Sequence, residues 1–409
     1  MKVTQIYAYP IKALRPMPLD TARLTKQGLE HDRRFMLLKV REDGSFQNVQ
    51  IIYFPECARL FQAIDGDDIV VTHRPAETAT QNQGPDPKLR VPLRPDTAGL
   101  GTVDIQLFGA DTRAYRMGAE PYDRWFSTCL GYEVILVYIG DGRRRILAHS
   151  PRQEAEAEAE RERANTNTAP TTTTTTTSSS SFSWLSSITS YVTGRPQKPT
   201  ESEEDDDDWL TFNEAAPYLV ASQASLHDVS SRLPPGETVD MMRFRPNIVV
   251  DGDEVTCWEE DYWGELLVSP RSSDSGGGGD DDGSKQEIDD SSDSNSNSSR
   301  NRTCRLALTA NCGRCNSINI DYETGRMAEG EAGTVLKKLM RDRRVDAGDK
   351  WSPIFGRYAH LLPAQQRDAV RTTNVDHQDT SIGAVISVGD EVKVTRRNAE
   401  RTVWRWPKT

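Results

Sequence analysis

The chain has 409 residues, 36% of them hydrophobic, and a formal net charge of −12 at pH 7. This length favours two domains or one large composite fold. The acidic balance argues against nonspecific nucleic-acid binding, which requires a net basic face. No apolar run reaches the roughly 18 residues of a membrane helix, and the start, MKVTQIYAYPIKAL, lacks the apolar core of a secretory signal.

Two segments of low sequence complexity account for nearly all of the net charge. Residues 151–208 contain Glu-Ala repeats, a threonine run and the block ESEEDDDD, and they carry a net charge of −7. Residues 270–302 contain GGGGDDDG and a Ser/Asn/Asp tract, and they carry −4. Neither segment has enough large apolar side chains to offset the entropy cost of folding, so we interpret both as disordered insertions. The remaining chain is nearly neutral.

Residues 1–115 are predicted to be mostly β. Short runs rich in β-branched and aromatic residues are separated by Gly, Asp and Pro. These runs are VTQIYAYP (3–10), RRFMLLKV (33–40), IIYFP (51–55) and DIVVTH (68–73). PYDRWFSTCLG (121–131) predicts a short helix that ends at Gly131, and EVILVYIG (133–140) predicts a buried strand.

The region from 209 to 398 is predicted to mix strands with a few helices. SLHDVSSRL (225–233) predicts a helix with Ser225 at its N-cap. CRLALTA (304–310) alternates apolar and polar residues, as a half-buried strand does. Ile318 and Ile320 alternate in the same way, so we expect a β-hairpin whose connection holds two cysteines. The other predicted elements are a strand in FRPNIVVDG (244–252), a helix at 334–344 and a final strand at 386–394.

The two cysteines lie in the stretch NCGRCNSINIDYETG (311–325) and admit several interpretations. A structural zinc site needs further ligands, and the chain has no second CxxC. A thioredoxin-type pair should open a helix, but this pair leads into a predicted strand. Both cysteines can also be small buried residues at a tight turn formed with Gly313.

A single thiolate bound to a soft metal is the remaining interpretation. Arg314 would help to keep Cys315 deprotonated in such a site. One cysteine alone cannot hold a metal, so an organic anchor would be needed. An anionic anchor would in turn require Lys and Arg side chains from elsewhere in the chain. The residues alone leave these alternatives open.

Four motifs, taken together, resemble a known family. NCGRCNSINIDYETG resembles the signature of MOSC domains, which are related to the C-terminal part of molybdenum cofactor sulfurase. YPIKALRPMPLDTARLTKQGLEHDRRFML resembles the β-barrel that precedes this domain. RFRPNIVVDG with EEDYWGELL, and SPIFGRYAHL with VGDEV, are similar to the middle and closing motifs. The closest resemblance is to the amidoxime-reducing component proteins.

The resemblance implies a mainly β fold with some helix (α+β), in two parts. Residues 1–150 would form the MOSC N-terminal β-barrel domain, followed by the low-complexity insertion at 151–208. Residues 209–398 would form a MOSC β-barrel that carries the second insertion, 270–302. A cofactor would lie in the cleft between the two parts.

The resemblance also implies a molybdenum–molybdopterin cofactor (Moco). Cys315 matches the family position that ligates the metal and is therefore the implied catalytic residue, whereas Cys312 matches a cysteine that does not ligate it. The other matching cofactor contacts are Lys12, Arg33, Arg245, Asn247 and Gly313. Lys and Arg suit a phosphate, and an Asn amide can both donate to and accept from a pterin ring. Ala13 stands where many relatives have serine, so one cofactor hydrogen bond is expected to be missing.

The function implied is an oxidoreductase that reduces N-hydroxylated compounds such as amidoximes and hydroxylamines. Electrons would come from a separate protein, because no flavin or iron–sulfur motif is visible. The resemblance implies that this donor is cytochrome b5 with its NADH-dependent reductase. A non-enzymatic carrier of the cofactor or of sulfur is the alternative. A degenerate scaffold without metal is a third interpretation, against which the presence of Cys315, Arg33 and Arg245 argues.

The expected compartment is the cytoplasm, because the N-terminus reads as a strand rather than an anchor. An amphipathic pattern at 182–192 offers a second interpretation, association with the mitochondrial surface. A segment without any membrane role is the simpler interpretation of that pattern.

Overall fold

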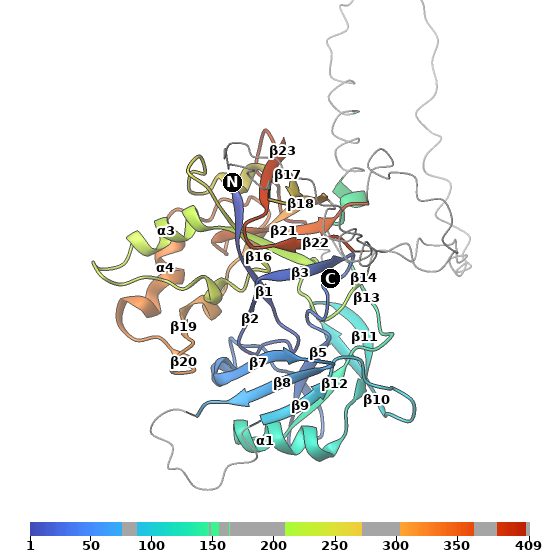
Figure 1. Ribbon diagram of the computed structural model, residues 1–409. Helices are drawn as coiled ribbons and strands as arrows, with labels where there is room; N and C mark the ends of the chain where they lie inside the picture. The colour runs from blue at the N-terminus through green and yellow to red at the C-terminus, as the bar shows by residue number, and fades with distance from the viewer. Residues whose placement is uncertain are drawn as a thin grey trace, which may run out of the picture.

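The computed structural model describes residues 1–75, 88–146, 149–154, 163, 209–271, 303–363 and 383–405. The two predicted insertions fall almost wholly outside these ranges, as does the amphipathic pattern at 182–192. The described part is mainly β with a few short helices, which confirms the predicted fold class (Figure 1). Within it, no helix is both long and apolar enough to span a membrane.

Seven strands form a closed barrel in the C-terminal half. Their order is β16-β15-β21-β18-β17-β23-β1, and pairing of β1 with β16 closes the ring. The bounds are β1 (Lys2–Ala8), β15 (Tyr218–Ser222), β16 (Ile248–Asp251), β17 (Trp263–Ser269), β18 (Cys304–Gly313), β21 (Ile354–Leu361) and β23 (Glu391–Arg397). Only β15 and β16 pair in parallel, because helix α3 (Gln223–Ser231) returns the chain between them. Trp263 and Leu306 are among the fully buried residues of this barrel.

Strand β1 pairs with strands on the other side of the domain boundary that the sequence predicted. It belongs to the segment 1–150, yet it pairs with β16 and β23 of the segment 209–398. Figure 1 shows this blue strand beside the yellow-green and red strands of the barrel. The first strand of the chain therefore completes the second barrel, while the boundary near residue 150 stays a prediction.

The N-terminal half has its own sheets and core. One sheet has the order β10-β11-β12-β5-β6 and the other β7-β8-β9. The bounds are β5 (Phe35–Val40), β6 (Phe46–Asn48), β7 (Leu60–Asp65), β8 (Asp68–His73), β9 (Lys88–Pro92), β10 (Thr102–Leu107), β11 (Ala110–Arg116) and β12 (Val134–Tyr138). Strand β12 is buried along its whole length because alternate residues enter two different core clusters, as its continuous apolar sequence indicates.

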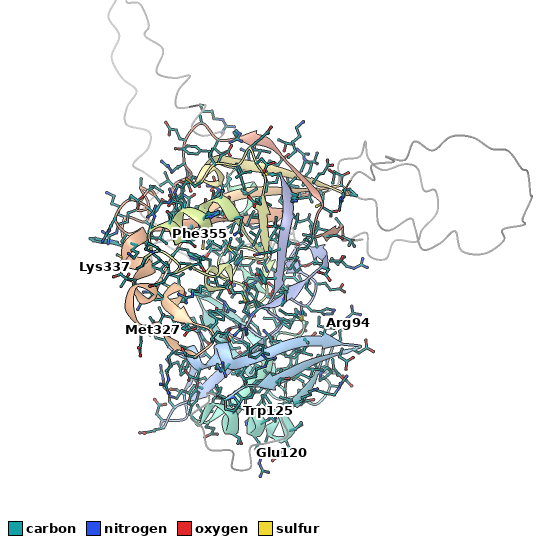
Figure 2. The ribbon with its side chains drawn as sticks, turned by 60° about the vertical axis from the view of Figure 1, so that its left-hand side comes forward. Arg94, Glu120, Trp125, Met327, Lys337 and Phe355 are labelled. Carbon is teal, nitrogen blue, oxygen red and sulfur yellow. The ribbon has the colours of Figure 1, made fainter. Side chains whose placement is uncertain are left out.

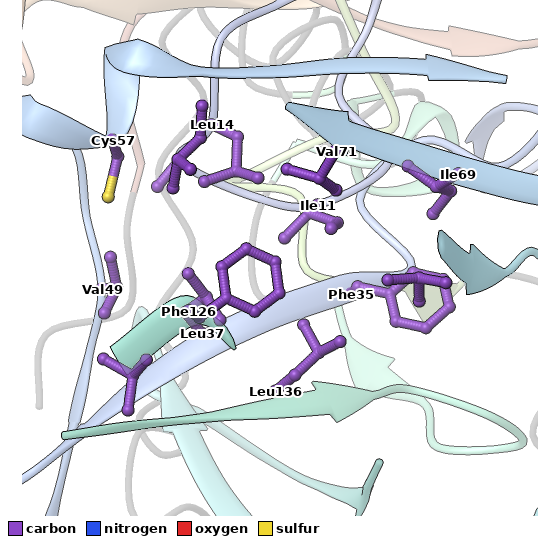
Figure 3. Close-up of a cluster of buried hydrophobic side chains, with 14 of the residues drawn as sticks. Ile11, Leu14, Phe35, Leu37, Val49, Cys57, Ile69, Val71, Phe126 and Leu136 are labelled. Atoms are coloured by element: carbon purple, nitrogen blue, oxygen red, sulfur yellow. The ribbon is translucent and has the colours of Figure 1, made fainter. Parts of the chain in front are cut away.

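The main core of this half packs between the two sheets and helix α1 (Arg124–Leu130) (Figure 3). Ile11, Phe35 and Phe126 lie in it and are buried. Gly131 ends the helix in a left-handed conformation, as predicted. Ile320 and Tyr322 join the same core from the C-terminal half, so the two halves share apolar packing.

Several short elements connect the larger ones. The strands are β2 (Met17–Leu19), β3 (Thr21–Thr25), β4 (Gly28–Leu29), β13 (Arg144–Arg145), β14 (Trp209–Leu210), β19 (Ile320–Asp321), β20 (Arg326–Met327) and β22 (Val385–Ser387). The helical elements are α4 (Val335–Leu339) and the turns η1 (Pro55–Arg59), η2 (Ala119–Asp123), η3 (Met241–Phe244), η4 (Glu259–Tyr262), η5 (Asn316–Asn319) and η6 (Gly330–Thr334).

Some local predictions are wrong. The expected strand at 51–55 is a turn followed by η1, where Pro55 occupies the first helical position. Ser225 is not the N-cap of α3, because the helix begins directly after β15 and Ser222 occupies the N-cap position, without a side-chain capping hydrogen bond. The expected helix at 334–344 shortens to η6 and α4, and the final strand divides into β22 and β23.

The expected hairpin around the cysteines is also wrong. Strand β18 continues through Cys312 to Gly313 and pairs with β17 and β21 instead. Ile318 lies in the 3-10 turn η5, and the short strand β19 pairs with β20 across the Tyr-Glu-Thr-Gly turn. The second cysteine therefore lies just beyond a central barrel strand.

Candidate functional site

One pocket between the two halves is lined by all six residues that the sequence predicted as site residues. Its volume is about 100 Å³, and it opens to solvent. The six are Lys12, Arg33, Arg245, Asn247, Gly313 and Cys315. They come from the segment after β1, the β4–β5 connection, the η3–β16 connection and the end of β18. Their roles as cofactor contacts stay predictions.

Three residues in the pocket wall have left-handed backbones. The φ angles are +74° at Ala13, +49° at Arg33 and +53° at Arg245. A non-glycine residue pays roughly 1–2 kcal/mol for this conformation, and such residues gather at functional sites. The surrounding hydrogen bonds hold them in place, since Arg33 N donates to Tyr9 O and Arg245 N donates to Met242 O.

The two arginines are oriented by the same aromatic ring. The guanidinium carbons of Arg33 and Arg245 lie 4.3 and 4.4 Å from the ring centroid of Tyr9, a cation–π distance. Tyr9 is itself fixed because its hydroxyl donates to Pro246 O at 2.8 Å. Arg33 also forms an ion pair with the buried carboxylate of Asp32. Both cations are thus set firmly before any ligand binds.

The side chain of Asn247 is fully engaged within the protein. Its amide nitrogen donates to Tyr7 O at 3.1 Å and to Asp32 Oδ2 at 3.2 Å. Its oxygen accepts from Leu219 N at 3.2 Å and Arg33 Nη1 at 3.3 Å. In this arrangement the amide positions the Asp32–Arg33 pair, and a direct contact to a pterin ring stays a prediction.

Lys12 is a buried cation among other cations. Its ammonium group donates to Phe212 O at 2.8 Å, and the residue is 6% exposed. Burial, together with the charges of Arg33, Arg144 and Arg245, lowers the pKa of Lys12 to about 7, against the opposing effect of Glu214. Among the charges that act on this ammonium group, Glu214 is the one acid, and three arginines oppose it.

Glu214 is a functional candidate that the sequence analysis missed. Its side chain is exposed to the pocket, and its Oε2 accepts from the hydroxyl of Tyr358 at 3.1 Å. Burial opposes ionisation, but Lys12, Arg314 and Arg33 hold the pKa of Glu214 below its usual value. Because the residue stands in an irregular segment, no periodicity or motif singled it out.

Arg144 fixes the segment that carries Glu214. This arginine is 1% exposed, and it donates from Nε to Thr211 O at 3.1 Å and from Nη2 to Glu214 O at 3.1 Å. The same segment supplies Phe212 O, the acceptor for Lys12. Arg144, which does not line the pocket, thus helps to position two residues that do, Glu214 and Lys12.

The two cysteines of the quoted motif have different environments. Cys312 is buried, and burial raises the pKa of its thiol. Cys315 is exposed and lines the pocket, with its sulfur 3.2 Å from Ser317 Oγ. Arg314 donates to Cys312 Sγ at 2.8 Å, and its charge also interacts with Cys315, so its expected support of the Cys315 thiolate stays a prediction.

The lining fits an anionic cofactor with an attached metal. Four cations face the pocket, namely Lys12, Arg33, Arg245 and Arg314, against the single carboxylate of Glu214 among the lining residues. An anion would stabilise the charged form of Lys12. Cys315 supplies the one exposed thiol in that lining, and thiolates suit soft metals. Among the described residues, no group of three or more His, Cys, Asp or Glu side chains could hold a metal ion.

Comparison with family models matches both halves. Residues 1–133 match the MOSC N-terminal beta barrel domain, and residues 207–393 match the MOSC domain. The chain therefore carries a MOSC domain preceded by a MOSC N-terminal beta barrel domain. The pocket described above is formed by residues of both matched domains.

Curated relatives resemble the chain at low identity. Mitochondrial amidoxime-reducing component 1 of Homo sapiens is 29% identical over 155 residues, 37% of this chain and 34% of the relative. Mitochondrial amidoxime reducing component 2 of Macaca fascicularis is 24% identical over 277 residues, 65% and 60% of the two chains. Molybdenum cofactor sulfurase of Oryza sativa subsp. japonica is 30% identical over 284 residues, 64% of this chain and 25% of the relative. Each match thus spans less than two thirds of the relative.

Proposed function

We propose that this MOSC protein binds Moco in the pocket and reduces N-hydroxylated compounds such as amidoximes and hydroxylamines. The observation that carries the proposal is the exposed thiol of Cys315 in a pocket lined by four cations. The names of the amidoxime-reducing relatives support the reaction class. In this reaction the substrate takes up two electrons and two protons and releases its oxygen as water.

The residues of the pocket would divide the work of holding the cofactor. Lys12, Arg33 and Arg245 would bind the phosphate and the pterin, and the thiolate of Cys315 would ligate the metal. When bound, molybdenum would supply a centre that cycles between oxidation states and so provides the two electrons of the reduction. An anionic phosphate near Lys12 would raise the pKa of that amine and keep it charged.

The electron donor and compartment are further parts of the proposal. Electrons would come from a separate carrier, cytochrome b5 with its NADH-dependent reductase, as the family resemblance suggests. The relatives carry the word mitochondrial in their names, which favours association with the mitochondrial surface over an unattached cytoplasmic protein. Small N-hydroxylated molecules would be the substrates.

A carrier of the cofactor or of sulfur is the alternative function. The match to the sulfurase of Oryza sativa favours it, since it covers 64% of this chain. The two functions differ in one assay. A reductase turns over hydroxylamine compounds when it receives electrons, whereas a carrier holds the cofactor without turnover.

Molybdenum content per chain tests the proposal. Protein from a cofactor-competent host should contain close to one molybdenum per chain by plasma mass spectrometry, and Cys315→Ala should lose most of it. Cys257→Ala is the matched control, because Cys257 is exposed but does not line the pocket. Folded protein without molybdenum in any of the three forms would refute the cofactor site. Equal metal in all three would remove Cys315 as the ligand.

A further inference from the structure

A second cavity adjoins the cofactor pocket. Its volume is about 340 Å³, and it shares Glu214, Gly313 and Tyr358 with the pocket described above. Its remaining lining is Phe108, Ala215, Asn311, Asp346, Asp349, Ile354 and Trp404. The two spaces therefore meet at a common wall, of which the Glu214 carboxylate and the Tyr358 ring are part.

The lining of this second cavity has the opposite electrostatic character to the first. Three carboxylates and three aromatic rings line it, and none of the described lining residues is Lys or Arg. The aromatic rings are those of Phe108, Tyr358 and Trp404, with the last two 6.1 Å apart between centroids. Carboxylates with aromatic walls suit a flat organic cation, which gains both charge pairing and cation–π contact.

The three carboxylates are not equally available. Asp346 is 2% exposed, and it already accepts from Asn311 Nδ2, Gly348 N and Trp404 N, each at 2.8 Å. Asp349 accepts from Ser352 N at 3.1 Å and caps its own loop. These two carboxylates therefore shape the cavity, and their charges add to its negative potential.

Glu214 is the most exposed of the three carboxylates. Its side chain lies in the wall shared by the two cavities and is exposed, and the hydroxyl of Tyr358 donates to its Oε2 only. Among the described residues, Oε1 accepts no hydrogen bond. The cations of the first pocket favour its ionised form, which accepts hydrogen bonds and donates none. A ligand with two parallel N–H donors would match this acceptor.

We propose that the second cavity binds a planar amidinium-type cation, with Glu214 as the residue that selects it. The ligand's N–H groups would donate to Glu214, and its apolar body would lie against Trp404 and Tyr358. This inference deepens the proposed function, on which its biological meaning rests. It places the nitrogen end of a substrate, or of the amidine that its reduction yields, at the wall shared with the cofactor pocket.

Direct binding to the full chain, purified without cofactor, tests the inference independently of turnover. Isothermal titration calorimetry at pH 7 would compare benzamidine, an amidinium cation, with benzamide, its neutral isostere. The native chain should bind benzamidine at least tenfold more tightly than benzamide. Glu214→Gln should lose at least tenfold in benzamidine affinity, because the amide replaces the charged acceptor. Equal binding of the two ligands to the native chain would overturn the proposal.

A matched control separates the site from the overall negative charge. Glu133→Gln removes the same charge at an exposed position outside both cavities, and it should leave benzamidine affinity unchanged. An equal loss in Glu133→Gln and Glu214→Gln would overturn the proposal. If Glu214→Gln fails to fold by circular dichroism, Trp404→Leu replaces it and should weaken benzamidine binding at least threefold. Unchanged affinity in that folded variant would also refute the site.

The inference and the proposed function can fail separately. Selective benzamidine binding by a chain that holds molybdenum but reduces no N-hydroxylated compound would support the cavity and refute the reductase. Turnover of amidoximes by a chain that does not bind benzamidine would support the reductase and refute this cavity as the amidinium site.

Discussion

At the scale of single residues, Lys12 shows why the pocket favours an anion. A lysine that is 6% exposed and has its pKa lowered to about 7 is charged only part of the time at neutral pH. Its nearest cations are held in place by packing, with Arg33 on the Tyr9 ring and Arg144 on backbone carbonyls. These side chains cannot easily move apart, so a bound phosphate is the simplest way to stabilise the charged lysine.

Glu260 is a buried acid whose ionisation opposes folding. It is fully buried, its Oε2 accepts from Ser225 Oγ at 2.8 Å, and its Oε1 has no partner among the described residues. Burial raises the pKa of Glu260 from the ordinary 4.5 to about 7, and Asp261 adds to the shift. Because the folded-state pKa is the higher one, the stability contribution of Glu260 is full below pH 4.5. It is lost as the pH rises through about 7.

The pH dependence of unfolding tests this role of Glu260. Between pH 5 and pH 8, Glu260→Gln should lose less unfolding free energy than the native chain, by on the order of 2 kcal/mol. Urea titrations at both pH values measure the difference. Glu133→Gln, at an exposed position, should keep the native pH dependence. An unchanged pH dependence in Glu260→Gln would show that the acid is already ionised in the folded protein.

At the scale of elements, β18 shows what local sequence patterns can and cannot predict. The alternation in CRLALTA identifies the strand, but its partners β17 and β21 lie in other parts of the sequence. Ile318 and Ile320 mimic a second strand because both are buried, although Ile318 packs from a 3-10 turn. Alternation of apolar and polar residues indicates which residues are buried, but it does not indicate which strands pair with each other.

Gly313, at the end of β18, is required by a close approach of another loop. A Cβ atom at this position would lie 2.8 Å from Asp349 Oδ2 and 3.0 Å from Ser352 Cβ. Gly313→Ala should therefore destabilise the fold by roughly 1–3 kcal/mol, because the loop at 349–352 must shift. Urea unfolding measures the loss. Gly101→Ala is the control, since nothing lies within 4 Å of its added Cβ, and it should change stability by no more than about 0.5 kcal/mol. Equal changes in stability in Gly313→Ala and Gly101→Ala would show that the loop at 349–352 moves without a measurable energetic cost.

At the scale of the whole molecule, the ordered motifs predicted more than the local patterns did. Lys12 and Cys315 are 303 positions apart in the sequence, yet both line the predicted pocket. Motif resemblance supplied that juxtaposition, because periodicity carries no information on distant contacts. Glu214 and Tyr358 were missed for the same reason, since neither belonged to a position matched to the cofactor. Apolar contacts also join the halves, because Ile320 and Tyr322 pack in the N-terminal core. Figure 2 shows Trp125 of that core in the N-terminal half and Phe355, which belongs to a separate cluster, in the other.

The position of β1 in the second barrel predicts that the two halves do not fold independently. Without β1, strands β16 and β23 lose their shared neighbour, and the barrel opens to two unpaired edges. Residues 209–409 expressed alone should therefore aggregate or unfold without a cooperative transition. Co-expression with residues 1–150 should give a complex that unfolds in one urea transition. A full chain cut at a protease site inserted at residue 180 is the control for the break itself, and it should keep that transition. Cooperative unfolding of residues 209–409 alone, with the stability of the full chain, would show that the barrel closes without its first strand.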